Sequence, residues 1–397
     1  MTDDSPDRPA RSLDTVAVHA GRDAVEGAVT FPIFQSATFH SRASDTSYDA
    51  VRYARLSNTP SHDQLHEKLA AICGAEAALT ASSGMAAIAA TLLTLLEAGD
   101  HALVQRGVYG GTHAFATREL ARLGVAVTLV DGADPASWEA ARRPETKVFY
   151  AEAITNPLVE VTDLAAVVAF ARRHGLKTVV DATFATPVNL RPLALGVDVE
   201  VHSATKYLAG HSDVIAGVAA GARDLVRAIT ARQNHFGGSL DPHACFLVER
   251  GLKTLALRVR RQNDNARALA EALAAHPAVR RVHYPGVGAD NAVPTAMRAA
   301  YEGGGFGGVL SAEIAGGGEA AERLIATLEL VTHAPSLGGV ETLITRPATT
   351  THVGLPRAER EALGVGDGLV RIACGIEGTA DLVADVRQAA DRATSPR

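Results

Sequence analysis

A lysine surrounded by small hydroxylated residues is the feature of this sequence with the clearest chemical potential. Lys206 follows Ser203 by three residues and Thr205 by one, just beyond the apolar run of residues 197–201. A lysine held in a pocket loses part of its hydration, which lowers the pKa of the amine and makes the amine nucleophilic. The stretch alone is equally consistent with an ordinary lysine at the end of a strand.

A carboxylate upstream favours the interpretation that Lys206 lies in a pocket. Asp181 ends the run of residues 176–181, L-K-T-V-V-D, which is typical of a buried strand with a carboxylate at its C-terminal end. Pyridoxal phosphate needs an anion facing its pyridine nitrogen and an amine that reacts with its aldehyde. Asp181 and Lys206 are therefore predicted to serve one cofactor site.

Two further segments could bind the phosphate of such a cofactor. The small residues Ser82, Ser83 and Gly84 precede an apolar helix predicted at 85–96, and free N–H groups at a helix N-terminus favour an anion. Ser83 also suits a simple helix cap. Tyr53 and Arg55 would project to the same side of an extended backbone and could bind a phosphate, although a solvated arginine fits the pattern as well.

Short apolar runs alternate with helical patterns through the middle of the chain. The pattern predicts helices at 112–123 and 163–174, and strands at 102–104, 125–130, 148–151, 178–180 and 197–201. This alternation predicts an α/β fold with a mostly parallel sheet, whose ligands bind at the carboxyl ends of the strands. The residues that follow these strands are Tyr109, Glu152, Asn156, Asp181 and Lys206.

The last third of the chain predicts a smaller α+β domain. A long helical pattern covers residues 245–274, and strands return at 282–284, 308–314, 342–345 and 369–373. Arg371 lies inside the last of these apolar runs, where an unpaired charge would be costly, so it is expected to meet a buried carboxylate or the carboxylate of a substrate. The predicted division is an N-terminal arm at 1–60, a cofactor-binding large domain at 61–250 and a C-terminal domain at 251–397.

Composition excludes several classes of protein. The chain has 397 residues, of which 47% are apolar and 21% charged, and its net charge of −6 gives no electrostatic case for nucleic acid or an anionic membrane. Its three cysteines lie far apart, and its first dozen residues are polar without a signal-peptide pattern, so a cytoplasmic location is predicted. His62 and His66 have helical spacing, but no third ligand is implied, and no metal is expected.

Several ordered motifs resemble the Cys/Met-metabolism family of pyridoxal-phosphate enzymes. The likeness runs from about residue 15 to residue 382, with one mild departure: the chain has D-A-T-F where the family usually has D-N-T-F. The motifs that carry it are Y-G-G-T at 109–112, T-N-P at 155–157, D-A-T-F at 181–184, S-A-T-K-Y at 203–207 followed by G-H-S-D-V-I-A-G, R-G-L-K-T-L at 250–255 and S-L-G-G-V-E-T-L at 336–343.

The resemblance implies a fold type I enzyme that assembles as a homotetramer of tight dimers, with pyridoxal 5′-phosphate as cofactor. Lys206 would bind the cofactor aldehyde covalently, Asp181 would keep the ring nitrogen protonated, and Tyr109 would stack on the ring and assist the leaving group. Further cofactor contacts would come from Gly84, Met85, Thr183, Ser203 and Thr205, and from Tyr53 and Arg55 supplied by the neighbouring subunit. The substrate carboxylate would be bound by Asn156, Ser336 and Arg371.

The expected activity is γ-elimination or γ-replacement on sulfur amino acids or O-acylhomoserine, of the cystathionine γ-lyase or γ-synthase type. A methionine γ-lyase or a homoserine-ester sulfhydrylase remains an alternative. An aminotransferase on the same fold and a non-catalytic pyridoxal-phosphate-binding regulator are more remote alternatives.

Three positions depart from the pattern by which cystathionine enzymes of the family read the distal part of the substrate. Where those enzymes typically carry two acidic residues and an arginine, this chain has Arg52, Pro335 and Ala114. Two carboxylate partners for a distal ammonium group are therefore missing, while Arg52 and Arg346 could favour an acyl carboxylate. Methionine γ-lyases typically have a cysteine where this chain has Gly111.

Overall fold

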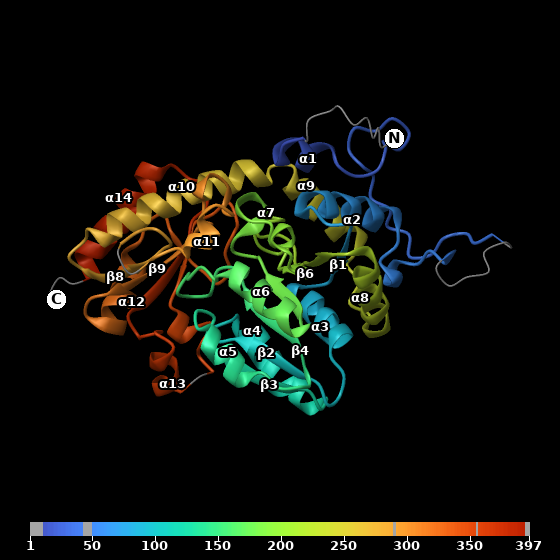
Figure 1. The fold of residues 1–397 in the computed structure, drawn as a ribbon. Helices are drawn as coiled ribbons and strands as arrows, with labels where there is room; N and C mark the ends of the chain where they lie inside the picture. Colours follow the sequence, from blue (N-terminus) through green and yellow to red (C-terminus); the bar gives the residue numbers. More distant parts are fainter. Residues whose placement is uncertain (1–10, 43–49, 289–290, 355, 394–397) are drawn as a thin grey trace.

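The computed structural model describes residues 11–42, 50–288, 291–354 and 356–393. Its strands form one sheet of seven and one of five, with helices packed around both (Figure 1). Most of the polar N-terminal tail, residues 1–10, lies outside the described residues. None of the described helices combines the length and the apolar character needed to cross a membrane.

The seven-stranded sheet is parallel except at one edge. Its strand order is β1-β7-β6-β5-β4-β2-β3, and β7 runs antiparallel to both of its neighbours. All five strands predicted for the middle of the chain are present, whereas β1 and β7 were not predicted. In sheet order the strands are β1 (Ala77–Ala81), β7 (Gly217–Gly221), β6 (Val199–His202), β5 (Lys177–Asp181), β4 (Thr146–Glu152), β2 (His101–Gln105) and β3 (Ala126–Val130).

Helices cover both faces of this sheet, as expected for a parallel sheet whose strands carry apolar residues throughout. The apolar helix expected at 85–96 is α3 (Gly84–Leu95), which packs against β6 and β7. The helix expected at 112–123 consists of α4 (Gly110–Ala114) and a π-helical turn at Phe115–Leu120. The other helices of this part of the chain are α2 (Pro60–Cys73), α5 (Pro135–Ala141), α6 (Leu164–His174), α7 (Thr186–Asn189) and α8 (Arg223–Phe236).

The helical pattern expected at 245–274 contains a break. It forms α9 (Pro242–Leu252) and α10 (Leu255–Ala274), separated by Lys253 and Thr254. Close packing at the end of α9 accompanies the break: a Cβ atom on Gly251 would lie 2.1 Å from the carbonyl oxygen of Ala209. Helix α10 then runs to the smaller sheet, where it packs against α14 and β8 (Figure 1).

The smaller sheet has the order β10-β11-β12-β9-β8 and is antiparallel except between β10 and β11. Its two sheet-covering helices, α12 and α14, pack on each other. We retain 61–250 and 251–397 as the proposed domain division. The elements are β8 (Val279–His283), α11 (Thr295–Arg298), β9 (Val309–Ile314), α12 (Gly317–Thr327), β10 (Thr332–His333), β11 (Leu343–Thr345), α13 (Arg357–Ala362), β12 (Leu369–Ala373) and α14 (Thr379–Ala393).

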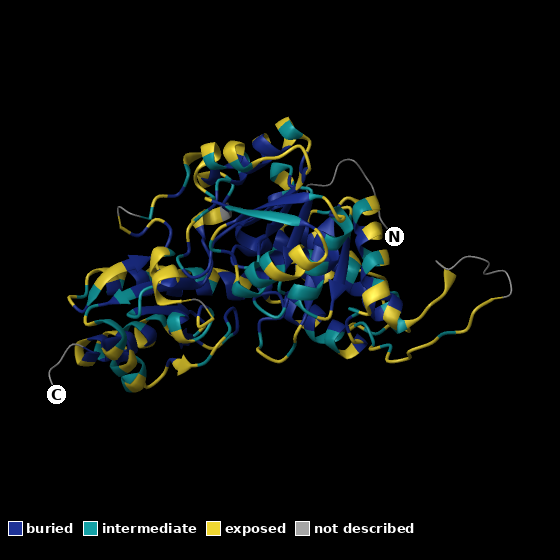
Figure 2. Ribbon diagram, turned by 90° about the horizontal axis from the view of Figure 1, so that it is seen from below, coloured by how far each residue is buried: buried dark blue, intermediate teal, exposed yellow. Residues whose placement is uncertain are grey.

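The N-terminal segment is only partly an extended arm. Residues Leu13–His19 form helix α1, which buries Leu13 and Ala17 and packs against α2 and α10 of the same chain. This helix was not expected. Residues 35–42 and 50–53, by contrast, are mostly exposed and project from the body of the molecule (Figures 1 and 2).

A buried lysine ties α1 to the rest of the chain. Lys68 on α2 is 1% exposed, and its Nζ donates hydrogen bonds to the carbonyl oxygens of Ala17 and Val18, both at 3.0 Å. The same Nζ lies 3.3 Å from a carboxylate oxygen of Glu249 on α9. Lys68 therefore connects three helices that are distant in the sequence.

We expect Lys68→Met to destabilise the fold by about 3 kcal/mol, because the change removes the partner of two backbone carbonyls and of one oxygen of the buried Glu249 carboxylate, while Lys253 still pairs with the other oxygen. The thermal unfolding midpoint of the purified protein is the measurement. Arg122→Ala is the matched control, since the Arg122–Glu119 ion pair is solvent-exposed and such a pair contributes about 1 kcal/mol at most. Equal shifts in the two variants would contradict the role given to Lys68.

Candidate active site

A cavity of about 350 Å³ brings together residues from both sheets. It lies at the carboxyl ends of β4 and β5 and in front of the N-terminus of α3, where a parallel sheet of this kind binds its ligands. Eleven of the residues predicted from the sequence line it: Gly84, Met85, Tyr109, Asn156, Asp181, Thr183, Ser203, Thr205, Lys206, Ser336 and Arg371. A second cavity of about 470 Å³ shares Asn156 with the first, but neither a lysine nor a tyrosine lines it.

Lys206 is held in a tight turn directly after β6. Its backbone N–H donates to the carbonyl of Ser203, and its own carbonyl accepts from Gly210. The side-chain Nζ donates to the Oγ atom of Ser336 at 2.8 Å. Burial, with a smaller contribution from the positive charge of Arg371, lowers the pKa of the Lys206 amine to about 8. A substantial fraction of this amine is thus neutral, and nucleophilic, at mildly alkaline pH.

Arg371 is a buried guanidinium without a carboxylate partner among the described residues. It lies on β12, donates to Asn156 Oδ1 at 3.1 Å and to the carbonyl of Ser336 at 2.9 Å, and its Nε atom has no hydrogen-bond partner in the described structure. Burial lowers the Arg371 pKa to about 10. A buried cation of this kind is costly unless an anion reaches it, so Arg371 is arranged to receive a carboxylate.

Ser336 joins the lysine to the arginine. Its Oγ atom accepts from Lys206, and its carbonyl oxygen accepts from Arg371. Its φ of 106° lies in a region that residues with a side chain rarely adopt, and such strain persists only when the surroundings impose it. Ser336 in this conformation bonds two different cations, one through its side chain and one through its carbonyl.

Two carboxylates stand side by side where β4 and β5 end. Asp181 and Glu152 are register partners, and both line the cavity. Asp181 accepts hydrogen bonds from the backbone N–H of Thr183 at 2.9 Å and from its hydroxyl at 2.5 Å. Burial raises the pKa of Asp181, whereas the two hydrogen bonds from Thr183 oppose this by favouring the ionised carboxylate.

The part of the cavity at the N-terminus of α3 is suited to an anion. Ser83 caps α3 by accepting from the backbone N–H of Ala86, and the next residues, Gly84 and Met85, line the cavity at the positive end of the helix dipole. Gly84 allows a close approach here, since a Cβ atom on it would lie 2.8 Å from the Cβ of Ser203. The Thr205 hydroxyl lines the same cavity and bonds to the backbone of Ala216.

Two predicted residues do not line the cavity of their own chain. Tyr53 is 40% exposed, and Arg55 donates to the carbonyl of Asn234 near the end of α8. The guanidinium carbon of Arg55 lies 5.8 Å from the centre of the Tyr53 ring, so the two residues remain neighbours. Any contact between this pair and the cofactor would have to come from another subunit.

The cavity fits pyridoxal phosphate. A partly neutral amine on Lys206 suits its aldehyde, a buried carboxylate on Asp181 suits its ring nitrogen, and the helix N-terminus at Gly84 suits its phosphate. The unpartnered Nε of Arg371 leaves a donor for a substrate carboxylate. The sequence drew attention to all four positions.

Other cavity residues were not predicted from the sequence. Glu152 stood out only by its place after a strand, and Ile154 had no signal of its own. Ile215 and Leu337 lie inside motifs of the chain, but nothing in the sequence assigned them to the cavity wall. Thr351 comes from the loop after β11, far from any motif. Only the folded chain brings these residues to the site.

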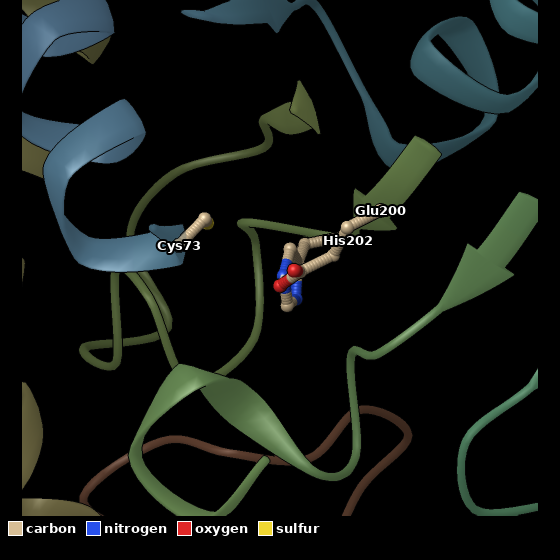
Figure 3. A group of neighbouring side chains, drawn as sticks. All are labelled: Cys73, Glu200 and His202. Atoms are coloured by element: carbon tan, nitrogen blue, oxygen red, sulfur yellow. The ribbon is translucent and has the colours of Figure 1, made fainter. Parts of the chain in front are cut away.

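One buried group of metal-ligand residues lies apart from this cavity. Figure 3 shows Cys73 at the end of α2 beside Glu200 and His202 on β6; their ligand atoms lie within 4.8 Å of one another. Glu200 and His202 are hydrogen-bonded to each other, and the positive charge of Arg191 acts on Cys73. We interpret the group as a hydrogen-bonded part of the core, because it supplies only three ligand atoms and a metal would sit near a guanidinium.

His62 and His66 also have protein partners. The ring nitrogens of His62 bond to Thr59 and to the carbonyl of Leu240, and Nε2 of His66 bonds to Thr80. The absence of a metal in the functional protein stays a prediction.

The fold and the site define an α/β enzyme that uses pyridoxal phosphate. Residues 14–391 match the model of the Cys/Met metabolism PLP-dependent enzymes, and the chain belongs to that family. It is 43% identical to the cystathionine beta-lyase of Bacillus subtilis (95% of this chain, 96% of the relative) and 40% identical to the L-methionine gamma-lyase of Porphyromonas gingivalis (95% and 96%). The crystal structure of cystathionine gamma-lyase from Lactobacillus plantarum, complexed with L-serine, superposes with a TM-score of 0.90 at 37% identity, covering 96% of this chain and 99% of that one.

Proposed function

We propose that this chain is a carbon–sulfur lyase whose cavity binds the α-carboxylate of an amino acid on Arg371 and removes its Cα proton with Lys206. The observation that carries the proposal is the linked arrangement of these two residues. A buried guanidinium without a carboxylate partner in the described structure and an amine whose pKa is lowered to about 8 are both hydrogen-bonded to Ser336.

Binding and proton transfer are assigned to separate groups. Arg371 binds the substrate carboxylate, and Asn156 fixes the guanidinium by accepting from it. Pyridoxal phosphate, when bound, supplies an electron sink that acidifies the Cα–H bond. Asp181 keeps a negative charge beside the ring nitrogen, while Gly84, Met85, Ser203 and Thr205 hold the phosphate. Lys206 carries the proton between Cα and Cβ, and Tyr109 assists departure of the substituent.

Gamma-elimination or gamma-replacement on a compact substrate is the proposed reaction type. The carboxylates that line the cavity, Glu152 and Asp181, both lie at the carboxyl-terminal ends of their strands, whereas Pro335, Leu337 and Ile215 contribute an apolar wall. That wall offers no carboxylate to a distal ammonium group, so a short thioether or an acylated homoserine is a better fit than cystathionine.

The two arginines considered for distal recognition differ in their surroundings. Arg346 is not a cavity residue of this chain: it is buried and bonds to Glu322 and to the carbonyl of Asp367, so its charge is already paired and is less suited to favour an acyl carboxylate. Arg52 is 40% exposed at its side chain and lies 3.2 Å from Asp63, which offsets part of its charge. Apolar fit therefore carries more of the proposed selectivity than positive charge does.

Methionine gamma-lyase remains the second candidate, because one relative with that name is 40% identical. Against it, a Cβ atom on Gly111 would lie 2.6 Å from a ring carbon of Tyr109 and 3.1 Å from the sulfur of Met85. A cysteine at this position would therefore require the Tyr109 ring to move.

We expect kcat/KM for methionine-like thioethers or O-acylhomoserine to exceed that for cystathionine. Two missing carboxylate partners for the distal ammonium correspond to about 1–3 kcal/mol each. The measurement is a substrate panel scored separately for 2-oxobutanoate, pyruvate, ammonia and thiol, which separates cleavage at Cγ from cleavage at Cβ. The predicted selectivity is wrong if cystathionine is preferred to every shorter substrate. The lyase assignment is wrong if no substrate of the panel is cleaved.

We also propose a cytoplasmic homotetramer built from dimers. Free buried cysteines at positions 73, 245 and 374 support a reducing compartment. Exposed apolar side chains on Val51, Tyr53 and Phe236, together with a cavity that lacks Tyr53 and Arg55 of its own chain, support subunit association near this arm.

A further inference from the structure

Glu152 is the one carboxylate in the cavity to which the proposed chemistry gives no task. It is 4% exposed and comes from the end of β4. Its Oε1 atom accepts the backbone N–H of Tyr109 at 2.6 Å. Its own backbone N–H donates to Gln105 Oε1 at 2.9 Å, and its carbonyl accepts from the Thr162 hydroxyl. Both backbone groups and the carboxyl group are thereby fixed.

The contact with Tyr109 occurs at the start of a closely fitted turn. Tyr109 precedes two glycines and α4, makes no side-chain cap and is 44% exposed, and its carbonyl accepts from the backbone N–H of His113. A Cβ atom on Gly110 would lie 2.9 Å from the carbonyl of Thr351, and one on Gly111 would meet the Tyr109 ring, so this turn is closely fitted. By accepting the backbone N–H of Tyr109, Glu152 fixes the backbone of a residue that lines the cavity.

The charge state of Glu152 follows from its neighbours. Asp181 is its register partner on β5, so the two side chains leave the sheet on the same face. No lysine or arginine of the described residues forms an ion pair with Glu152; of the cations that line the cavity, Lys206 bonds to Ser336, and Arg371 bonds to Ser336 and Asn156. Tyr109 is the remaining titratable group on the packed turn, and Tyr150 on β4 stays uncharged because burial and the two carboxylates raise its pKa.

Two adjacent buried carboxylates without a shared cation do not both stay ionised. Asp181 receives two hydrogen bonds from Thr183, and the nearby His202 also favours its charge. Burial and the charge of Asp181 raise the pKa of Glu152 well above its usual range, and they outweigh the backbone N–H groups of Tyr109 and Asn156, which favour its ionised form. The proton therefore belongs on Glu152.

We propose that Glu152 is a positioning residue that acts as an uncharged acid: it fixes the backbone of Tyr109 for stacking on the cofactor and leaves Asp181 as the only negative charge at the ring nitrogen. The inference rests on the stacking role proposed for Tyr109. A neutral amide of the same shape reproduces both properties, since its oxygen accepts from Tyr109 and the group adds no charge beside Asp181.

The test is the dissociation constant of pyridoxal phosphate, measured by titrating cofactor-free protein, for Glu152→Gln, Glu152→Ala, Tyr109→Ala and the Glu152→Ala/Tyr109→Ala double variant. We expect Glu152→Gln to bind like the wild type, and Glu152→Ala and Tyr109→Ala each to bind about tenfold more weakly. The double variant is expected to be no weaker than Tyr109→Ala alone, because Glu152 acts through Tyr109. Glu152→Asp, one methylene shorter, replaces Glu152→Ala if the latter does not fold.

Three results would overturn the inference, each for a different reason. Equal weakening in Glu152→Gln and Glu152→Ala would mean that the negative charge matters. Additive effects in the double variant would mean that Glu152 does not act through Tyr109. An unchanged constant in Tyr109→Ala would remove the stacking role on which the inference depends, while the lyase activity would still be judged by the substrate panel.

Discussion

Lys206→Ala is expected to lose nearly all turnover, a fall of at least about 10²–10⁴-fold, because the same amine binds the cofactor and transfers the substrate proton. The wild type should be yellow with pyridoxal phosphate, and the variant should bind the cofactor only without a covalent link. The measurements are kcat, the visible absorption spectrum, and the mass of the protein after borohydride reduction with cofactor present.

Lys177→Ala is the matched control, since Lys177 begins β5, at the end of the strand away from Asp181, and its half-exposed side chain is paired to Asp198. It should keep both activity and the visible band. A wild-type protein that stays colourless with pyridoxal phosphate would contradict the assignment of Lys206 as the residue that binds the cofactor covalently, whatever the activity of the variants.

The pH dependence of cofactor attachment follows from the same residue. Burial lowers the pKa of the Lys206 amine from about 10.5 to about 8, so the neutral form dominates above pH 8 in the cofactor-free protein. The attachment rate should therefore rise with pH to a plateau above about pH 8, instead of continuing to rise towards pH 10.5 as for an exposed lysine.

The parallel sheet could be predicted from the sequence, and so could the site residues at the carboxyl-terminal ends of its strands. Asp181 and Lys206 each follow an apolar run, and the carboxyl ends of neighbouring parallel strands lie together. The period of the apolar residues does not reveal sheet order, and it also missed two strands, β1 and the antiparallel β7. Ala77–Ala81 and Gly217–Gly221 contain mostly alanine and glycine, and a run of such small residues carries little strand signal.

Contacts between segments that are distant in the chain could not be predicted from the sequence. Helix α1 forms because Leu13 and Ala17 find apolar partners on α2 and α10, although seven residues carry almost no periodic signal of their own. Arg346 and Arg371 look similar in sequence, each near an apolar strand. Arg346 bonds to Glu322, whereas Arg371 lines the cavity without a carboxylate partner among the described residues. Only the packing decides which arginine is available to a substrate.

The site is expected to be shared between subunits, and this makes a second large effect testable. Arg55→Ala and Lys206→Ala should each be nearly inactive as homo-oligomers, because each removes one group from every site. Arg55 lies outside the cavity of its own chain, where it bonds to the carbonyl of Asn234. A mixed dimer would instead contain one site with both groups intact.

Co-expression of the two variants with different affinity tags, followed by tandem purification, isolates the mixed oligomers. Each mixed dimer has one wild-type site and one site lacking both groups, so half of the wild-type activity per dimer is expected, or about a quarter if unselected subunits associate at random. Co-expression of each single variant with itself under the same two tags gives two reference activities. Mixed oligomers no more active than the mean of these two references, with their composition confirmed by mass spectrometry, would place Arg55 and Lys206 in the same subunit's site, and an Arg55→Ala homo-oligomer as active as the wild type would remove Arg55 from the site. Activity above that mean can arise only if one chain supplies the amine and another the guanidinium.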